Sequence, residues 1–403
     1  MKNFMFTCLL TAGVLINVST VAQAQSIKEQ IGEVIPGFDY SLSFRYRMEG
    51  VNQENSLSDA TASTLRSRLT LRATPLAGWG LLVEVDNVTA VGSKRYDSLA
   101  LNDYRGLYSV VADPTGTELN QASITFSPAT GHSFSLGRQR INHANQRFVG
   151  GVGWRQNEQT YDAVTYKYTS GLLDVNYSYL DKVHRVFGGK TVSIQTTEFD
   201  TEGNVLLGTL KQGWGDVSAY VYALDIENAA ALSSMTYGLS YSGTIKGFAI
   251  NAALAQQSDY ANNPINYDTE FLSFSAAKSF GPVRALVGYE LLGSDNNVAA
   301  FKTPLATLHA FQGWADVFLN TPAAGIEDAY LTLSGTLQGI TLISTYHDFS
   351  AEEGGISYGS EIDIQASYTF NSTVSGAVKF ASYSSDGFAV DTEKVWLTVS
   401  FSF

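Results

Sequence analysis

The sequence predicts an all-β protein, a transmembrane antiparallel β-barrel of eighteen strands with short periplasmic turns and long extracellular loops. Three observations lead to this fold class. Segments of about eleven residues alternate apolar and polar side chains along the chain, and none carries a sustained helical period. Short and long connections alternate between these segments. The last segment alternates up to a terminal Phe.

Composition agrees with this class and excludes others. The 403 residues include 38 acidic and 25 basic side chains, and charged residues make up only 16% of the chain. Tyr and Phe are frequent, with 22 of each, whereas Pro occurs 8 times. A chain with a formal net charge of −13 and no basic tract is not expected to bind nucleic acid. No phosphate loop, nucleophile motif or zinc motif is present, so we expect no enzyme activity, no metal and no cofactor.

The N-terminus predicts export from the cytoplasm. Residues 1–24 have a basic Lys2, an apolar run over 4–18 and the cleavage motif Ala22-Gln23-Ala24, the pattern of a signal peptide. The barrel is then expected over residues 25–403. The one cysteine, Cys8, lies in the signal, which excludes disulfides from the mature chain. An exported chain of this kind suits the outer membrane of a Gram-negative bacterium.

Each strand is predicted from its alternation and from the turn residues that bound it. The predicted strands cover residues 38–50, 62–74, 79–91, 118–128, 131–141, 160–169, 172–184, 204–212, 214–226, 234–245, 247–260, 268–280, 282–293, 325–335, 339–350, 358–370, 373–384 and 391–403. Long loops are expected at every second joint, over 51–61, 92–117, 142–159, 185–203 and 294–324. Tight turns lie between them, which is the asymmetry of a barrel with periplasmic turns and outer loops.

Alternation also predicts which face of each strand meets lipid. In the strand over 358–370, Ile362 and Ile364 fall on one face and Glu361 and Asp363 on the other. A charge on the lipid face costs roughly 2–4 kcal/mol at the membrane midplane, so we assign the charged face to the lumen. Outer-membrane lipid is therefore an expected partner. Eighteen strands leave an aqueous channel.

The last strand carries a second expected interaction. Apolar residues occupy every second position up to Phe403, which resembles the terminal strand of bacterial outer-membrane barrels. That resemblance implies recognition of Phe403 by the barrel assembly machinery.

Arginines are concentrated in one part of the predicted barrel. Eleven of thirteen lie between Arg45 and Arg155. Those on the first two strands share the polar faces, opposite Glu84 and Asp86 on the third strand. On the fifth strand, strict alternation would direct Arg138 and Arg140 at lipid, so we expect a bulge near Gly137 that turns them inward, or else a position above the membrane.

The loop over 142–159 extends this cluster. It contains Arg147 and Arg155 among several Asn and Gln residues, and Gly150, Gly151 and Gly153 would let it bend into the lumen. Guanidinium groups bind carboxylates in a bidentate manner. The predicted site for an anionic solute comprises Arg45, Arg47, Arg66, Arg68, Arg72, Arg138, Arg140, Arg147, Arg155, Glu84 and Asp86.

Several stretches resemble the alginate-export-type outer-membrane porin family. They are STLRSRLTLRA (63–73), DPTGTELNQA (113–122), LGRQRI (136–141), NQRFVGGVGWRQNEQTYDA (145–163), HAFQGWADVFLNTP (309–322) and the C-terminal DTEKVWLTVSFSF. The resemblance implies an eighteen-strand barrel with an arginine-rich lumen that passes a polyuronate. The outer loops here are mostly acidic or neutral, so uptake of an oligosaccharide or an organic anion is equally consistent with the sequence.

The predicted function is therefore an outer-membrane channel for anionic solutes, of the uronate oligo- or polysaccharide type. A general diffusion porin whose arginines pair with acids and brace the wall is one alternative, and a structural or adhesive barrel is another. His347-Asp348 raises the possibility of a membrane hydrolase, but a polar pair at the membrane interface explains it more simply.

Overall fold

The computed structural model describes residues 30–100, 105–188 and 196–403 as a closed antiparallel β-barrel. Eighteen strands form its wall: β1 (Asp39–Gln53), β2 (Ala60–Ala73), β3 (Trp79–Arg95), β4 (Gly116–Phe126), β5 (His132–Gln139), β6 (Thr160–Thr169), β7 (Leu173–His184), β8 (Glu198–Gln212), β9 (Gly215–Ile226), β10 (Ser234–Ile245), β11 (Phe248–Asp259), β12 (Asp268–Phe280), β13 (Val283–Leu292), β16 (Ile326–Leu337), β17 (Ile340–Ser350), β18 (Ser357–Thr369), β19 (Val374–Ser385) and β20 (Thr392–Ser402). The predicted signal peptide lies outside the described residues.

Consecutive strands pair around the whole wall, and β1 pairs with β20 to close it. All eighteen predicted strands are confirmed. The largest change in bounds is at β8, which begins at Glu198, because its outer half carries charged residues that hide the alternation. The connection before β16 contains two short strands, β14 (Ser294–Asp295) and β15 (Ala299–Ala300), and a helical turn, η2 (Leu308–Ala310). A further turn, η1 (Glu227–Leu232), links β9 to β10.

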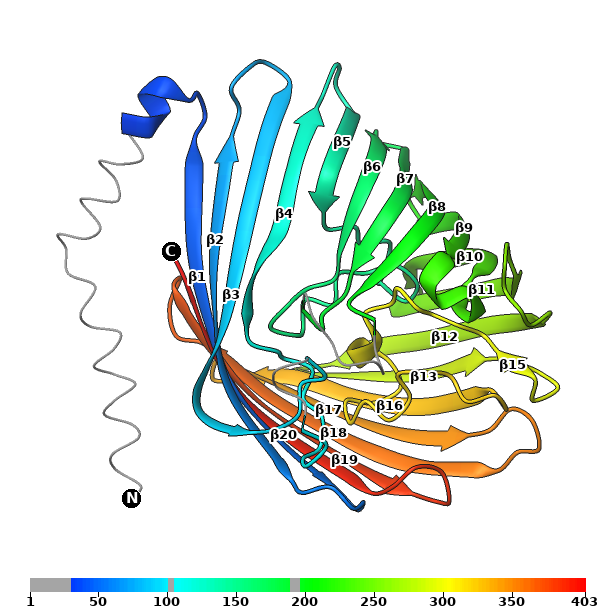
Figure 1. Cartoon of the computed structure of the whole chain (residues 1–403). Helices are drawn as coiled ribbons and strands as arrows, with labels where there is room; N and C mark the ends of the chain where they lie inside the picture. The colour runs from blue at the N-terminus through cyan, green and yellow to red at the C-terminus, as the bar shows by residue number, and fades with distance from the viewer. Residues whose placement is uncertain (1–29, 101–104, 189–195) are drawn as a thin grey trace.

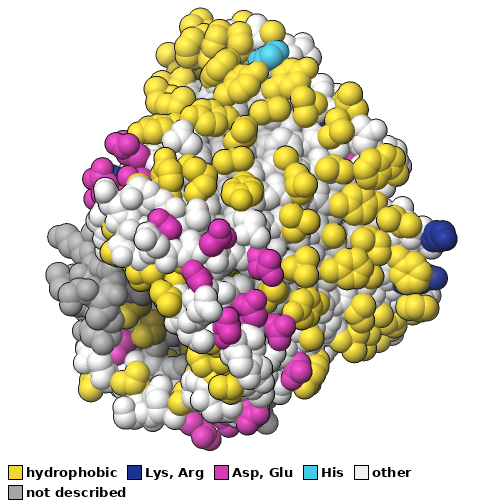
Figure 2. Space-filling model, turned by 90° about the vertical axis from the view of Figure 1, so that its right-hand side faces the viewer, with side chains coloured by type: hydrophobic (Ala, Val, Ile, Leu, Met, Phe, Trp, Pro, Cys, Tyr) yellow, Lys and Arg dark blue, Asp and Glu magenta, His cyan; other side chains and the backbone are white. Residues whose placement is uncertain are grey.

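The outward face is apolar, as alternation predicted. Leu69, Ile362 and Ile364 are exposed on this face, whereas Glu361 and Asp363 are buried inside. Figure 2 shows apolar side chains over a broad band of the surface, with carboxylates gathered to one side of it. Such a band around a closed barrel is the surface expected in contact with lipid. Among the described residues, no helix has the length and hydropathy needed to cross a membrane.

Two long loops turn into the barrel. We call residues 140–159, between β5 and β6, the third loop, and residues 293–325, between β13 and β16, the seventh loop. Figure 1 shows both running inside the ring of strands. Their backbones meet where Gly150 donates a hydrogen bond to Leu305 O at 2.8 Å and Thr307 donates one to Gln146 O at 3.0 Å. The two loops therefore form one internal layer across the lumen.

Gly153 lies in a turn of the third loop, which Arg155 closes by donating a hydrogen bond to Val152 O at 3.1 Å, but the loop's other sharp bends do not use its glycines. The left-handed backbone positions are occupied by Ala144, Gln146 and Val152, with φ of 47°, 66° and 48°. Gly150 has a different role, since a Cβ there would lie 2.4 Å from Thr307 Oγ1. Its missing side chain lets the seventh loop approach closely.

Candidate functional site

The arginines of β2 and the third loop form an inner cluster with three carboxylates. Arg68 binds Asp86 through two hydrogen bonds of 2.6 Å and donates a third, of 2.7 Å, to Glu158. Arg140 donates to Glu84 and to Glu158, and Arg66 lies 3.8 Å from Glu158. Three guanidinium groups thus face three carboxylates. This part of the site carries no excess charge.

Glu158 holds the third loop against the wall. Burial by itself would raise the pKa of Glu158, but the charges of Arg68 and Arg140 outweigh burial and hold its pKa at about 2. The carboxylate is therefore ionised at neutral pH. Glu158 was not among the predicted site residues, although it is one of only two acids in the arginine-rich stretch from 137 to 163.

A second cluster joins β1 to both loops. Arg45 donates to Gln156 Oε1 at 3.0 Å and to Gly153 O at 2.9 Å. Arg47 donates to Trp154 O at 2.7 Å, and its guanidinium lies 4.0 Å from the centroid of that indole ring. The third loop therefore meets the arginines of β1, as predicted. Backbone carbonyls and an amide accept these hydrogen bonds, and the carboxylate of Asp113 lies 4.0 Å from Arg47 Nη1.

Arg155 and Lys394 share a carboxylate of the seventh loop. Asp316 accepts hydrogen bonds from Arg155 at 3.1 Å and from Lys394 at 2.8 Å. Arg155 also donates to Glu49 at 2.9 Å. Lys394 and Asp316 were missed as site residues, although Lys394 lies on the polar face of the last strand and Asp316 in the stretch from 309 to 322.

His309 completes this group as a neutral imidazole. Its Nδ1 lies 2.7 Å from Asp316 and its Nε2 lies 2.9 Å from Lys379 Nζ. Burial lowers the pKa of His309 to about 3. We therefore assign the proton to Nδ1, which donates to Asp316, and leave Nε2 to accept from the ammonium.

The remaining predicted arginines lie apart from these clusters. Arg147 is buried in the third loop, donates to Glu290 at 2.9 Å and to Gln312 at 3.1 Å, and lies over Phe311. Arg72 is exposed on β2, and no ion pair to it is found among the described residues.

The prediction that a bulge turns both Arg138 and Arg140 into the lumen is wrong for Arg138, whereas Arg140 does turn inward. Gly137 has a φ of 113°, but the pairing of β5 with β4 and β6 continues without a shift through Arg138. Arg138 therefore keeps the outward direction of Leu136 and binds Asp162 at 2.8 Å. Arg140 lies beyond the last residue of β5, where the chain leaves the wall and turns inward. The end of the strand, rather than a bulge, directs it into the lumen.

A cleft of about 300 Å³ lies between the two loops and the wall. Its sides are apolar and include Val51, Leu57, Leu99, Val152, Trp154, Leu308 and Leu319. Its charged lining consists of Arg155, Arg185 and Lys394 against one carboxylate, Asp316. An ammonium has three donors, and Lys394 donates one hydrogen bond, to Asp316, among the described residues. The cleft thus combines apolar walls with cationic donors.

Among the described residues, no group of His, Cys, Asp and Glu side chains is arranged to hold a metal ion. His347 faces the lumen, where its Nδ1 lies 2.9 Å from Asp328. Its sequence neighbour Asp348 falls on the opposite face of β17. The His347-Asp348 pair is thus not a local unit, and no nucleophile motif was found in the sequence.

Comparisons with known proteins place the fold. No family model matches the chain, and no curated protein sequence matches it. Several solved structures do match the chain. OccK9 (OpdG) of Pseudomonas aeruginosa matches with a TM-score of 0.69 and 15% identity, over 92% of this chain and 99% of that one. OccAB4 of Acinetobacter baumannii matches with a TM-score of 0.68 and 12% identity, over 92% and 98%.

A third similar structure is P. aeruginosa OpdK, solved with vanillate, with a TM-score of 0.66 and 14% identity over 91% of this chain and 98% of that one. The resemblance to outer-membrane porins is thus supported at the level of the fold, whereas these comparisons do not single out the alginate-export type. The closed wall, its apolar band and these neighbours together identify the chain as a transmembrane barrel with the fold of Gram-negative outer-membrane porins.

Proposed function

We propose that the chain is an outer-membrane channel that selects small organic anions at the cleft between its third and seventh loops. The observation that carries this proposal is the composition of the cleft. Apolar side chains form its walls, and Arg155, Arg185 and Lys394 supply cationic donors at its charged side. A carboxylate attached to an apolar or ring-shaped body matches both parts.

The size of the cleft narrows the range of solutes. A volume of about 300 Å³ suits a single small molecule. A uronate monomer or an aromatic carboxylate fits, whereas a long polyuronate would require both loops to leave the lumen. OpdK, with which this chain shares its fold, was solved with vanillate, a small aromatic carboxylate. Uptake of small carboxylates therefore agrees better with this geometry than export of a polymer.

The inner cluster favours a second role for some arginines. Arg66, Arg68 and Arg140 face an equal number of carboxylates, so they brace the wall and anchor the third loop. A general diffusion porin with braced loops is the alternative that this observation supports. It predicts weak selectivity that does not depend on Arg155 or Lys394.

Single-channel recording separates these functions. The reversal potential in a KCl gradient should show anion selectivity for the native chain. Selectivity should fall in a double variant, Arg155→Gln with Lys394→Gln, and change little in the matched control Arg72→Gln, because Arg72 is exposed and distant from the cleft. Each screened ion contact contributes about a kilocalorie per mole or less, so high salt should weaken the effect.

Solute influx into liposomes supplies the second measurement. Galacturonate and benzoate should enter faster than glucose or lysine, and the double variant should lose this preference. Cation selectivity of the native chain, or equal effects of the control and the double variant, would refute the cleft as the selective element. Absence of any conductance would support a structural or adhesive barrel.

A further inference from the structure

The barrel wall is interrupted at the outer end of β5. β4 and β5 pair over only five residue pairs, from Ala122↔Arg138 to Phe126↔Phe134. β4 continues beyond this point to Gly116, and among the described residues this part of it pairs with β3 alone, on its other side. The Arg138 guanidinium donates to Leu119 O at 3.1 Å across the seam. A side chain therefore replaces the missing strand at this position.

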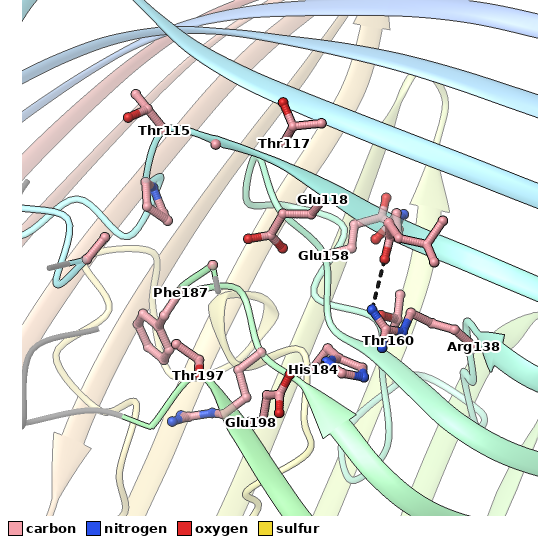
Figure 3. A pocket seen from close by; sticks show the side chains of 17 residues that line it. Thr115, Thr117, Glu118, Arg138, Glu158, Thr160, His184, Phe187, Thr197 and Glu198 are labelled. Carbon is pink, nitrogen blue, oxygen red and sulfur yellow. Dashed lines mark hydrogen bonds and ion pairs between the residues drawn. The ribbon is translucent and has the colours of Figure 1, made fainter. Parts of the chain in front are cut away.

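A cavity of about 450 Å³ lies at this seam, which we call the notch. Figure 3 shows Thr115 and Thr117 on the β4 side, with Arg138, Thr160 and His184 on the other. The outward direction of Arg138 is that of exposed Leu136. Asp162 likewise shares the direction of exposed Val164 on β6. The notch thus lies in the barrel wall, with Glu158 of the third loop on its inner side. It is separate from the cleft between the loops, although Arg185 and Phe187 border both.

The chemistry of the notch favours hydroxyl groups over phosphate. Among the described residues, the charged lining of the notch comprises Arg138 and Arg185 against three glutamates, Glu118, Glu158 and Glu198. Arg138 is paired with Asp162 at 2.8 Å, and the ring nitrogens of His184 lie 2.8 Å from Asp162 and 3.0 Å from Glu198. Carboxylates therefore outnumber guanidinium groups around the notch, which disfavours an anionic headgroup. Threonine hydroxyls at Thr117, Thr160 and Thr197, together with carboxylates, offer both donors and acceptors to neutral hydroxyls.

The surroundings of the notch indicate how such a ligand would arrive. Leu119, at its edge, is 44% exposed, and Leu136 and Val164 on the neighbouring strands are 61% and 48% exposed. These apolar residues connect the notch with the apolar band on the outward face of the barrel. Phe187 presents an aromatic ring to the notch. A sugar in the notch could therefore carry acyl chains along Leu119, Leu136 and Val164.

We propose that the notch at the β4–β5 seam binds the sugar headgroup of a membrane glycolipid, independently of solute passage through the lumen. Hydroxyls of the sugar would exchange hydrogen bonds with the threonine and glutamate side chains. The acyl chains would cover the apolar residues below. The ligand class is a neutral saccharide attached to lipid, and a free saccharide is the other source of the same chemistry.

The test is native mass spectrometry of the full chain in a detergent without sugar. The probes are monoglucosyl diacylglycerol, phosphatidylglycerol with the same acyl chains, and methyl glucoside. The blocking variant is Gly116→Phe, because Gly116 lines the notch and a Cβ there meets nothing within 4 Å. Gly208→Phe on β8 is the matched control, since Gly208 also faces open space and lies outside the notch.

Monoglucosyl diacylglycerol should bind the native chain and Gly208→Phe equally and Gly116→Phe about tenfold more weakly, whereas phosphatidylglycerol should not distinguish the three. If methyl glucoside competes with the glycolipid, the site binds saccharides in general. If methyl glucoside does not compete, the site is specific for glycolipid. Preference for phosphatidylglycerol, or unchanged binding to Gly116→Phe, would overturn the proposal.

Conductance of Gly116→Phe should equal that of the native chain, which separates this site from the proposed channel. If Gly116→Phe fails to fold, the double variant Thr117→Val with Glu198→Gln supplies the same test. Its control is Glu202→Gln, an exposed glutamate on β8 outside the notch. Unchanged glycolipid binding to the double variant would likewise overturn the proposal.

Discussion

Replacing Glu158 with glutamine preserves the shape of the side chain and removes the charge that anchors the third loop. In the native structure Glu158 lies 2.7 Å from Arg68 and 3.8 Å from Arg66, and it also accepts from Arg140. The variant leaves three guanidinium groups facing only Glu84 and Asp86. A buried cluster with one unmatched cation should be less stable.

The magnitude follows from the pKa of Glu158. The pKa of Glu158 falls from an ordinary value of 4.5 to about 2 in the folded protein. Each pKa unit corresponds to about 1.4 kcal/mol, so the ionised carboxylate contributes about 3 kcal/mol to the free energy of unfolding. The folded-state pKa is depressed, so this contribution is present above pH 4.5. It is lost as the pH falls through about 2.

Urea unfolding of the barrel in lipid vesicles measures this contribution. Glu158→Gln should lower the free energy of unfolding by about 3 kcal/mol at pH 7, and its difference from the native chain should shrink between pH 4.5 and pH 2. The control is Glu202→Gln, which removes an exposed carboxylate of β8. Native stability of Glu158→Gln at pH 7, or a difference that does not depend on pH, would refute the anchoring role of Glu158.

Three further predictions concern the wall, the last residue and the contact between the loops. Leu333→Arg on the lipid face of β16 should destabilise the folded barrel by about 2 kcal/mol and so lower its folding yield in vesicles. The adjacent Ser334→Arg, directed into the lumen, should fold normally, and equal yields would refute the assigned faces. Deletion of Phe403 should reduce the heat-modifiable barrel in the outer membrane, and unchanged amounts would exclude a role in assembly. Gly150→Ala should separate the loops and raise single-channel conductance, because its Cβ would lie 2.4 Å from Thr307 Oγ1; unchanged conductance would show that the loop contact does not limit flow.

The sequence by itself determined the wall of this protein. Alternation along a strand is a local property, because successive side chains point to opposite faces. It therefore predicted all eighteen strands, the lipid-facing position of Ile362 and the lumen-facing position of Glu361. The arginine-rich stretch also predicted correctly that the third loop meets Arg45 and Arg47.

Only the tertiary structure decided what the arginines do. Arg155 meets Glu49 across 106 residues of chain, and Arg147 meets Glu290 across 143. Such contacts depend on barrel closure and on how two loops share the lumen, and no local period encodes either. The outward position of Arg138 has the same origin. The pairing of β5 with β4 and β6 sets where β5 ends, and this end determines that Arg140, and not Arg138, leaves the wall.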